Sequence, residues 1–235
     1  KWIKQMIKCD KDRTLQSHRG SYKTTCVSIA LSILIILRPD KRILFMRKTD
    51  TDVKEVCRQV QNILESSYVK ELVRAIYGVE LVLTVKSSTE VSTNLTTTVS
   101  GTNQLVCIGI GGSLTGKHYD YIFTDDIVNL KDRLSRAERE HTKVIYQELQ
   151  NVKNRGGILY NSGTPWHKDD CFTQMPTPDV YTCYETGLIT DEELAEIRTK
   201  LTASLFAANY ELRHIAAEDV IFTSPHYSPA TDLLH

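Results

Sequence analysis

The sequence lacks the features that would assign it to several common classes. Its six cysteines are scattered and form no Cys-x-x-Cys pair, which argues against a zinc site or a disulfide framework and favours a reducing compartment. Its longest apolar run, from Cys26 to Leu37, is too short to cross a bilayer but suits a buried helix. It also lacks net charge, with 29 basic and 29 acidic residues, so any contact with nucleic acid must come from a local patch.

The 235 residues suffice for one large domain, or for a domain with an appendage. The chain starts at Lys1 rather than at Met, so we expect it to be a piece of a longer protein. Strands are expected at 13–16, 41–48, 105–112, 119–128 and 156–166, the last being the final core strand, with strands or a hairpin within 79–100. Helices are expected at 2–9, 26–38, 136–154 and 191–213, and one or two helices at 49–73 with Thr49 or Asp50 as N-cap. This alternation predicts an α/β fold whose largely parallel sheet is flanked by helices.

Two glycines are missing from a stretch that otherwise looks like a phosphate-binding loop. Residues 17–24 read SHRGSYKT, so Ser17 and Tyr22 stand where the pattern G-x-x-x-x-G-K-[ST] has glycine. In such a loop Lys23 would reach the β- and γ-phosphates, and the Thr24 hydroxyl would bind Mg²⁺. A positive φ at Tyr22 would cost about 1 kcal/mol or more, which ligand contacts could offset. A chance Lys-Thr pair is the alternative.

Two further stretches carry polar groups at predicted strand ends. YDYIFTDD (119–126) delivers Asp125 and Asp126 at the sheet edge where α/β proteins bind ligands. One carboxylate could hold Mg²⁺ while the other orients an attacking water, and we expect this strand to neighbour the one at 13–16. An acidic strand end that starts a turn is the alternative. NSGTPW (161–166) could present hydroxyls beside a γ-phosphate, or could be a turn alone.

In this order, the three pieces resemble the ATPase domain of phage large terminase subunits, the motors that package DNA into capsids. The resemblance rests on Arg19 four positions before the loop lysine, on SLTGKHYDYIFTDD (113–126), and on SGTPW running into WHKDD (162–170). It covers about residues 10–215 and implies a P-loop NTPase fold of the ASCE or RecA-like type. We therefore expect an ATPase domain at 1–215, and at 216–235 a tail or linker towards a nuclease domain that this sequence does not contain.

The resemblance also implies roles for residues, with ATP and Mg²⁺ as cofactors. The ATP-binding loop would comprise Ser17, His18, Arg19, Gly20, Ser21, Tyr22, Lys23, Thr24 and Thr25. Thr24 and Asp125 would hold Mg²⁺, and Asp126 would be the catalytic base where most of the family has Glu. Ser162, Gly163 and Thr164 would couple hydrolysis to subdomain movement.

Two kinds of arginine are implied. Arg19 would sense or grip the γ-phosphate, and a neighbouring subunit would supply an arginine finger. Arg155 is our first candidate for that finger, and Arg133, Arg136 and Arg139 are its rivals. A solvated surface cation is the alternative for each of them.

The partners implied are double-stranded DNA, a portal protein and a small terminase subunit. We expect a homo-oligomeric ring, a pentamer by resemblance, with a monomer in isolation as the alternative. The expected location is the host cytoplasm, transiently docked on a procapsid, with no membrane partner and no nuclease activity. A basic stretch from Lys131 to Lys143 could contact the DNA backbone, although Glu138 and Glu140 interleave it and helix salt bridges are the alternative.

Other interpretations stay open. A helicase-like nucleic-acid ATPase shares the two motifs but would need a second RecA-like domain. A degenerate nucleotide-binding module would bind without hydrolysis. His167, Asp169 and Asp170 suggest either a metal site or, as we expect, capping carboxylates in a loop. Adenine contacts would involve Trp2 or lie outside this sequence.

Overall fold

The computed structural model describes residues 1–213, so the tail predicted at 216–235 lies outside the described residues. The strands are β1 (Arg13–Ser17), β2 (Ile43–Arg47), β3 (Leu83–Lys86), β4 (Glu90–Thr93), β5 (Leu105–Gly109), β6 (Tyr119–Asp125), β7 (Lys153–Gly163) and β8 (Asp179–Tyr181). The helices are α1 (Trp2–Ile7), α2 (Lys23–Leu37), α3 (Asp50–Glu65), α4 (Ser67–Tyr77), α5 (Leu130–Leu134), α6 (Arg136–Val152), α7 (Cys183–Thr186), α8 (Asp191–Lys200) and α9 (Ala203–Phe206). Short 3₁₀ and π turns cover Cys171–Gln174 and Ala207–Glu211.

These strands form one sheet in the order β3-β4-β5-β2-β6-β7-β1-β8. The pairs from β5 through to β8 are parallel, and the β3–β4 hairpin joins the opposite edge antiparallel. The prediction that β1 and β6 are neighbours is wrong, because β7 lies between them. Ser162 on β7 is in register with Leu15 of β1 on one side and with Asp125 of β6 on the other. The strand ends of the two motifs are therefore bridged by the third.

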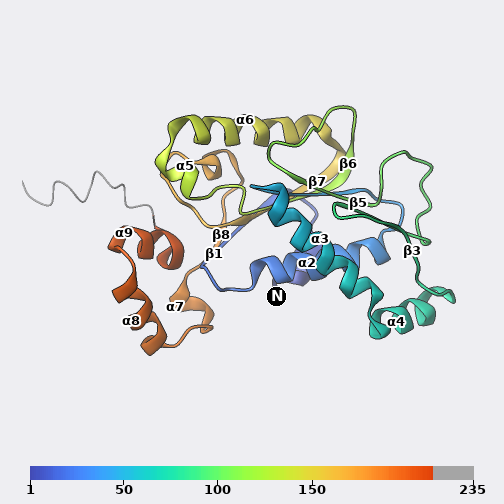
Figure 1. The fold of residues 1–235 in the computed structure, drawn as a ribbon, viewed down its shortest axis with the longest axis horizontal. Coiled ribbons are helices and arrows are strands. Elements are labelled where there is room, and N and C mark those ends of the chain that lie inside the picture. Colours follow the sequence, from blue (N-terminus) through green and yellow to red (C-terminus); the bar gives the residue numbers. More distant parts are fainter. Residues whose placement is uncertain (214–235) are drawn as a thin grey trace, which may run out of the picture.

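Side chains alternate between the two faces of the sheet along each strand, so each face has its own hydrophobic core. Phe45 packs in the cluster that includes α2 and α3, whereas Leu44 and Met46 pack in the cluster that includes α6. Figure 1 shows α6 covering one face and α2 with α3 the other, with α7, α8 and α9 gathered beside the β1–β8 edge. Within residues 1–213, no helix combines the length and apolarity that crossing a membrane requires.

Most predicted elements are present, with shifted boundaries. Thr49 caps α3 as predicted, accepting a hydrogen bond from the Asp52 backbone N–H at 3.2 Å. The helix predicted from Cys26 begins three residues earlier, because the first turn closes between the Cys26 N–H and the Tyr22 carbonyl. The helix predicted over 191–213 is interrupted at Leu201, after which Thr202 caps α9. A three-residue strand, β8, also follows β7 at the exposed edge.

Candidate functional site

The loop between β1 and α2 has the backbone of a phosphate-binding turn without the usual glycines. Tyr22 adopts φ +60° and Gly20 adopts φ +84°, so the tyrosine occupies the left-handed region that favours glycine. Tyr22 is 69% exposed, so its side chain lies largely in solvent. α2 starts at the next residue, Lys23. The positive end of a helix and its unpaired N–H groups thus face the loop, as anion binding requires.

Segments far along the chain hold this loop in place. The backbone N–H of His18 donates to the Tyr181 carbonyl at 3.2 Å, and the backbone N–H of Arg19 donates to the Asn209 carbonyl at 2.8 Å. The buried His18 ring contacts the Thr186 hydroxyl at 2.6 Å, and burial lowers the pKa of this imidazole. The loop is therefore anchored by α7 and by the π turn as well as by its own strand.

The two carboxylates at the end of β6 have different polar partners on the loop and on β7. Asp125 is fully buried and accepts hydrogen bonds from the Thr24 hydroxyl at 2.8 Å and the Ser162 hydroxyl at 2.6 Å. Asp126 adopts φ +46°, with its backbone N–H bonded to the Ser162 carbonyl at 3.0 Å. Its carboxylate lies 3.4 Å from the Lys23 ammonium. Burial raises the pKa of Asp126, a shift that Lys23 opposes.

The predicted coupling residues connect the loop to these carboxylates. The Thr164 hydroxyl donates to the Ser17 carbonyl at 3.3 Å and lies 3.4 Å from the Lys23 ammonium. A Cβ on Gly163 would come within 3.0 Å of the Phe172 ring and 3.4 Å of the Asp126 carboxylate, so this position is sterically tight. The end of β7 thus contacts both halves of the site.

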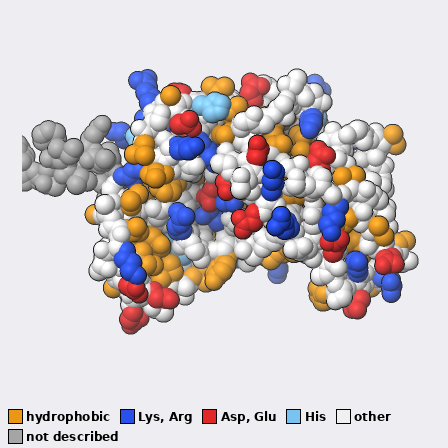
Figure 2. Space-filling model, in the orientation of Figure 1, with side chains coloured by type: hydrophobic (Ala, Val, Ile, Leu, Met, Phe, Trp, Pro, Cys, Tyr) orange, Lys and Arg blue, Asp and Glu red, His pale blue; other side chains and the backbone are white. Residues whose placement is uncertain are grey.

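These groups surround a cavity of about 540 Å³, within the size range of ligand sites in proteins. Its lining includes residues 19–25 of the loop, Arg47, Asp126, Thr164 and Trp166. Figure 2 shows acidic and basic side chains mixed near the middle of this face, over the end of the sheet that carries the loop. The cavity is polar and charged, which suits a phosphorylated ligand.

Comparison with known families decides the identity of this arrangement. Residues 19–139, a little over half of the chain, match the family described as terminase large subunit, T4likevirus-type, N-terminal. The chain belongs to this family. A comparison with curated proteins gave no significant match.

Solved structures of large terminases share the fold of this terminase domain. An ATPase-domain variant from Thermus phage P74-26 has a TM-score of 0.58 at 11% identity, over 91% of this chain and 93% of that one. The large terminase of another thermophilic bacteriophage has a TM-score of 0.56 at 9% identity, over 89% of this chain and 52% of that one. The latter protein in complex with ADP is similar, with a TM-score of 0.55 at 10% identity, over 92% and 53%. The terminase domain therefore has the P-loop NTPase fold and spans about half the length of this second large terminase.

Arg47 is a charged residue of the site that was not predicted from the sequence. Arg47, the last residue of β2, places its Nε 3.3 Å from Asp125 Oδ2 and its Nη2 3.6 Å from Asp126 Oδ2. In sequence it is one of several cations flanking an apolar strand. Only the pairing of β2 with β6 brings it beside the carboxylates.

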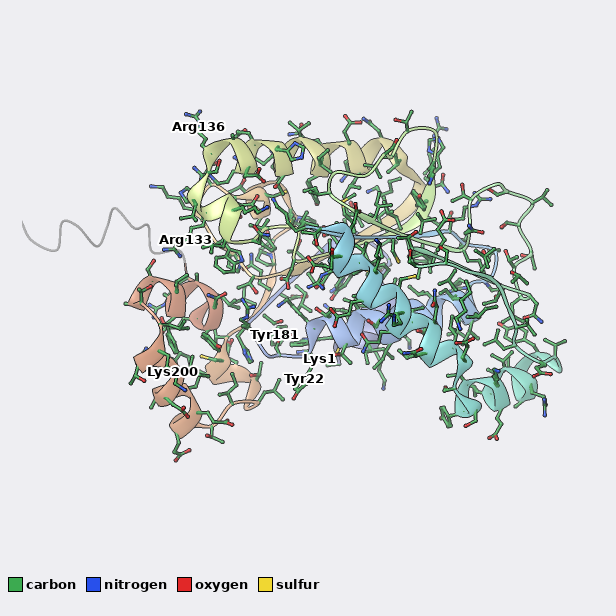
Figure 3. The ribbon with its side chains drawn as sticks, viewed as in Figure 1. Lys1, Tyr22, Arg133, Arg136, Tyr181 and Lys200 are labelled. Atoms are coloured by element: carbon green, nitrogen blue, oxygen red, sulfur yellow. The ribbon has the colours of Figure 1, made fainter. Side chains whose placement is uncertain are left out.

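The candidate finger arginines lie in different places. Arg155 is exposed in the first part of β7, before Ile158 and within the stretch where the register with β6 shifts. Ile158 itself is about 13 Å along the strand from Ser162 at roughly 3.3 Å per residue, so Arg155 lies towards the opposite end of the sheet from the site. Arg133 donates to Ser204, and Arg139 donates to the Asp132 carbonyl at 2.8 Å. Arg136 is exposed at the start of α6 and points outward (Figure 3).

The other charged stretches are largely paired. Lys143 contacts Glu140 at 3.1 Å and Asp169 at 2.7 Å, so helix and loop salt bridges occupy part of the predicted basic stretch. Asp170 accepts hydrogen bonds from the backbone N–H groups of Trp166, His167 and Phe172, as expected of a capping carboxylate. No His, Cys, Asp and Glu cluster suited to a metal ion occurs among residues 1–213.

Proposed function

We propose that this terminase domain is an ATPase motor that hydrolyses Mg-ATP to translocate double-stranded DNA into a procapsid. The observation that carries the proposal is that Lys23, Thr24 and Asp126 line one cavity, with the buried Asp125 bonded to Thr24, although the loop and the strand are far apart in sequence. Membership of the terminase family and an ADP-bound structural relative support it. The loop, the residues that would hold Mg²⁺ and the carboxylate that would act as base then have separate tasks.

Lys23 and the loop N–H groups would bind the phosphates, with Arg19 at the cavity wall to grip the terminal one. Thr24 and Asp125 offer the hydroxyl and carboxylate oxygens that Mg²⁺ prefers, and their oxygens lie 2.8 Å apart. When bound, the ion would neutralise charge that develops on the phosphates. Asp126 would orient the attacking water and accept its proton, a task that a raised pKa favours.

Steady-state phosphate release from Mg-ATP tests this proposal. Lys23→Ala should lose phosphate binding and Asp126→Asn should lose the proton acceptor, so both should abolish turnover. Lys54→Ala removes an exposed cation from α3, outside the cavity, and should retain full activity. Turnover that survives in Lys23→Ala would refute the assignment of the loop.

A groove beside the loop is suited to the adenine base. Its volume is about 290 Å³, and it is lined by Trp2, Tyr181 and Cys26 among others. The Trp2 and Tyr181 rings meet edge to face with centroids 5.3 Å apart, while Cys26 follows the loop on α2. Because a base gains about 1–3 kcal/mol by stacking on an aromatic ring, Trp2→Ala should weaken ADP binding at least several-fold in a calorimetric titration.

The assembly that performs translocation would be a ring on a procapsid in the host cytoplasm, with the portal protein and the small terminase subunit as partners. Both Arg136 and Arg155 are exposed, but Arg136 is favoured as the finger because it follows shortly after Asn129, the α5 N-cap that lines the cavity, whereas Arg155 lies at the far end of its strand. Specific activity should rise with protein concentration, and Arg136→Ala should remove that rise while Arg155→Ala preserves it. If Arg155→Ala removes the rise and Arg136→Ala preserves it, Arg155 is the better candidate for the finger. We propose no nuclease activity for these residues.

A further inference from the structure

Arg47 is held in the site by the strand that carries it. β2 pairs with β6 in parallel, with Met46 opposite Thr124, so Arg47 follows in line with Asp125. The next residue, Lys48, also lines the cavity, but its ammonium is paired with both carboxylate oxygens of the fully buried Asp132, at 3.0 and 2.9 Å. This buried pair fixes the chain immediately after β2. Arg47 is thereby directed at the carboxylates.

The contacts of Arg47 differ from those of a structural salt bridge. Its guanidinium lies near both acids of the site, 3.3 Å from Asp125 and 3.6 Å from Asp126, but its Nε makes no aligned hydrogen bond among the described residues. Asp125 Oδ2, the oxygen it approaches, also accepts the Thr24 hydroxyl. The Arg47 side chain is 17% exposed and lines the cavity. It is thus a loosely paired cation at the wall of the proposed nucleotide site.

The charges of this cluster balance among the protein's own side chains. Asp125 and Asp126 carry two negative charges, and Lys23 and Arg47 supply two positive ones. A divalent cation alone would join a neutral group beside a guanidinium, which opposes its binding by Coulomb repulsion. A cation that arrives with a polyphosphate would bring an excess of negative charge, which the guanidinium attracts.

We propose that Arg47 is a nucleotide-binding residue that contacts the terminal phosphate and makes metal binding depend on the nucleotide. This inference rests on the proposed function and adds that the site discriminates between Mg-nucleotide and free Mg²⁺. Arginine suits the task because its planar fork contacts carboxylate and phosphate oxygens in the same geometry.

The proposal predicts opposite effects on two ligands, which a merely structural role would not produce. Arg47→Met keeps the length of the side chain and removes its charge. In Arg47→Met, Mn²⁺ without nucleotide should bind about tenfold more tightly, measured by electron paramagnetic resonance. With Mg²⁺ present, ATP-γ-S should bind about tenfold more weakly, measured by calorimetry, while ADP should lose less.

Two controls separate charge at the site from net charge and from misfolding. Arg74→Ala removes an exposed cation from α4, which contributes nothing to the cavity, and should leave both affinities unchanged. Arg47→Lys retains the charge, so Mn²⁺ affinity should stay at the wild-type value even if Arg47→Met fails to fold.

Loss of both affinities in folded Arg47→Met, or no change in either, would overturn the proposal. Nucleotide binding that Lys23→Ala abolishes but Arg47→Met leaves intact would overturn this inference alone. A wild-type domain that binds no nucleotide would overturn the proposed function as well.

Discussion

Replacing Tyr22 by glycine should stabilise the domain, although it removes a large side chain. At φ +60° a residue with a Cβ pays about 1–2 kcal/mol relative to the right-handed region. Glycine relieves this strain but costs about 0.5–1 kcal/mol through the greater freedom of the unfolded chain. The ring is 69% exposed, so little packing is lost, and Figure 3 shows Tyr22 at the edge of the molecule. The net gain should be about 0.5–1 kcal/mol.

Thermal unfolding followed by circular dichroism measures this gain. A change of this size should raise the midpoint by about 1–4 °C in a domain of this length. Tyr22→Ala is the matched control, because it deletes the ring but keeps the Cβ at positive φ, and it should gain nothing. If Tyr22→Gly is less stable than the wild type, or if the alanine variant gains as much, backbone strain at this position is not the cause.

Three further changes test other parts of the fold by urea unfolding. Gly109→Ala should cost about 1–3 kcal/mol, because its Cβ would lie 2.7 Å from a backbone nitrogen in the first turn of α3, whereas Gly111→Ala has nothing within 4 Å and should be neutral. Asp132→Ala should cost about 3–5 kcal/mol by depriving buried Lys48 of its carboxylate, and the double variant Lys48→Met, Asp132→Leu should regain most of that loss; equal losses would contradict this. Because burial lowers the pKa of His18, the unfolded chain takes up its proton first as the pH falls, so stability should decline below about pH 6.5. His18→Gln should flatten that decline, and an unchanged pH profile would assign it to other groups.

The parts of the site that the sequence predicted are those encoded in short stretches. A strand, a turn and a helix start meet within residues 13–25, and β6 carries Asp125 and Asp126 at its own end. In each case the local order of strand, turn and helix is enough to place the polar residues at the end of a strand. The structure adds that their side chains converge, with Thr24 bonded to Asp125 and Lys23 beside Asp126.

The parts that the sequence did not predict depend on strand order. Local patterns cannot say that β7 separates β1 from β6, because strand order depends on pairing between segments far apart in sequence. Arg47 was missed for the same reason: its neighbours in sequence are ordinary strand residues, and its partners lie on another strand. Arg155 was placed near the coupling residues by sequence proximity, but an extended strand carries it to the far end of the sheet.

The hydrogen bonds that hold the phosphate loop can form only after later segments of the chain have been synthesised. The loop lies near the start of the chain, whereas the carbonyls that receive its His18 and Arg19 N–H groups belong to Tyr181 and Asn209. Synthesis proceeds from the N-terminus at about 5–20 residues per second, so the ribosome releases the loop well before the segments that fix it. A nascent chain that has reached only β7 holds the Lys23 loop without these two backbone bonds. If the loop binds nucleotide as we propose, the ability to bind it should therefore be acquired late in translation, after the sheet is complete.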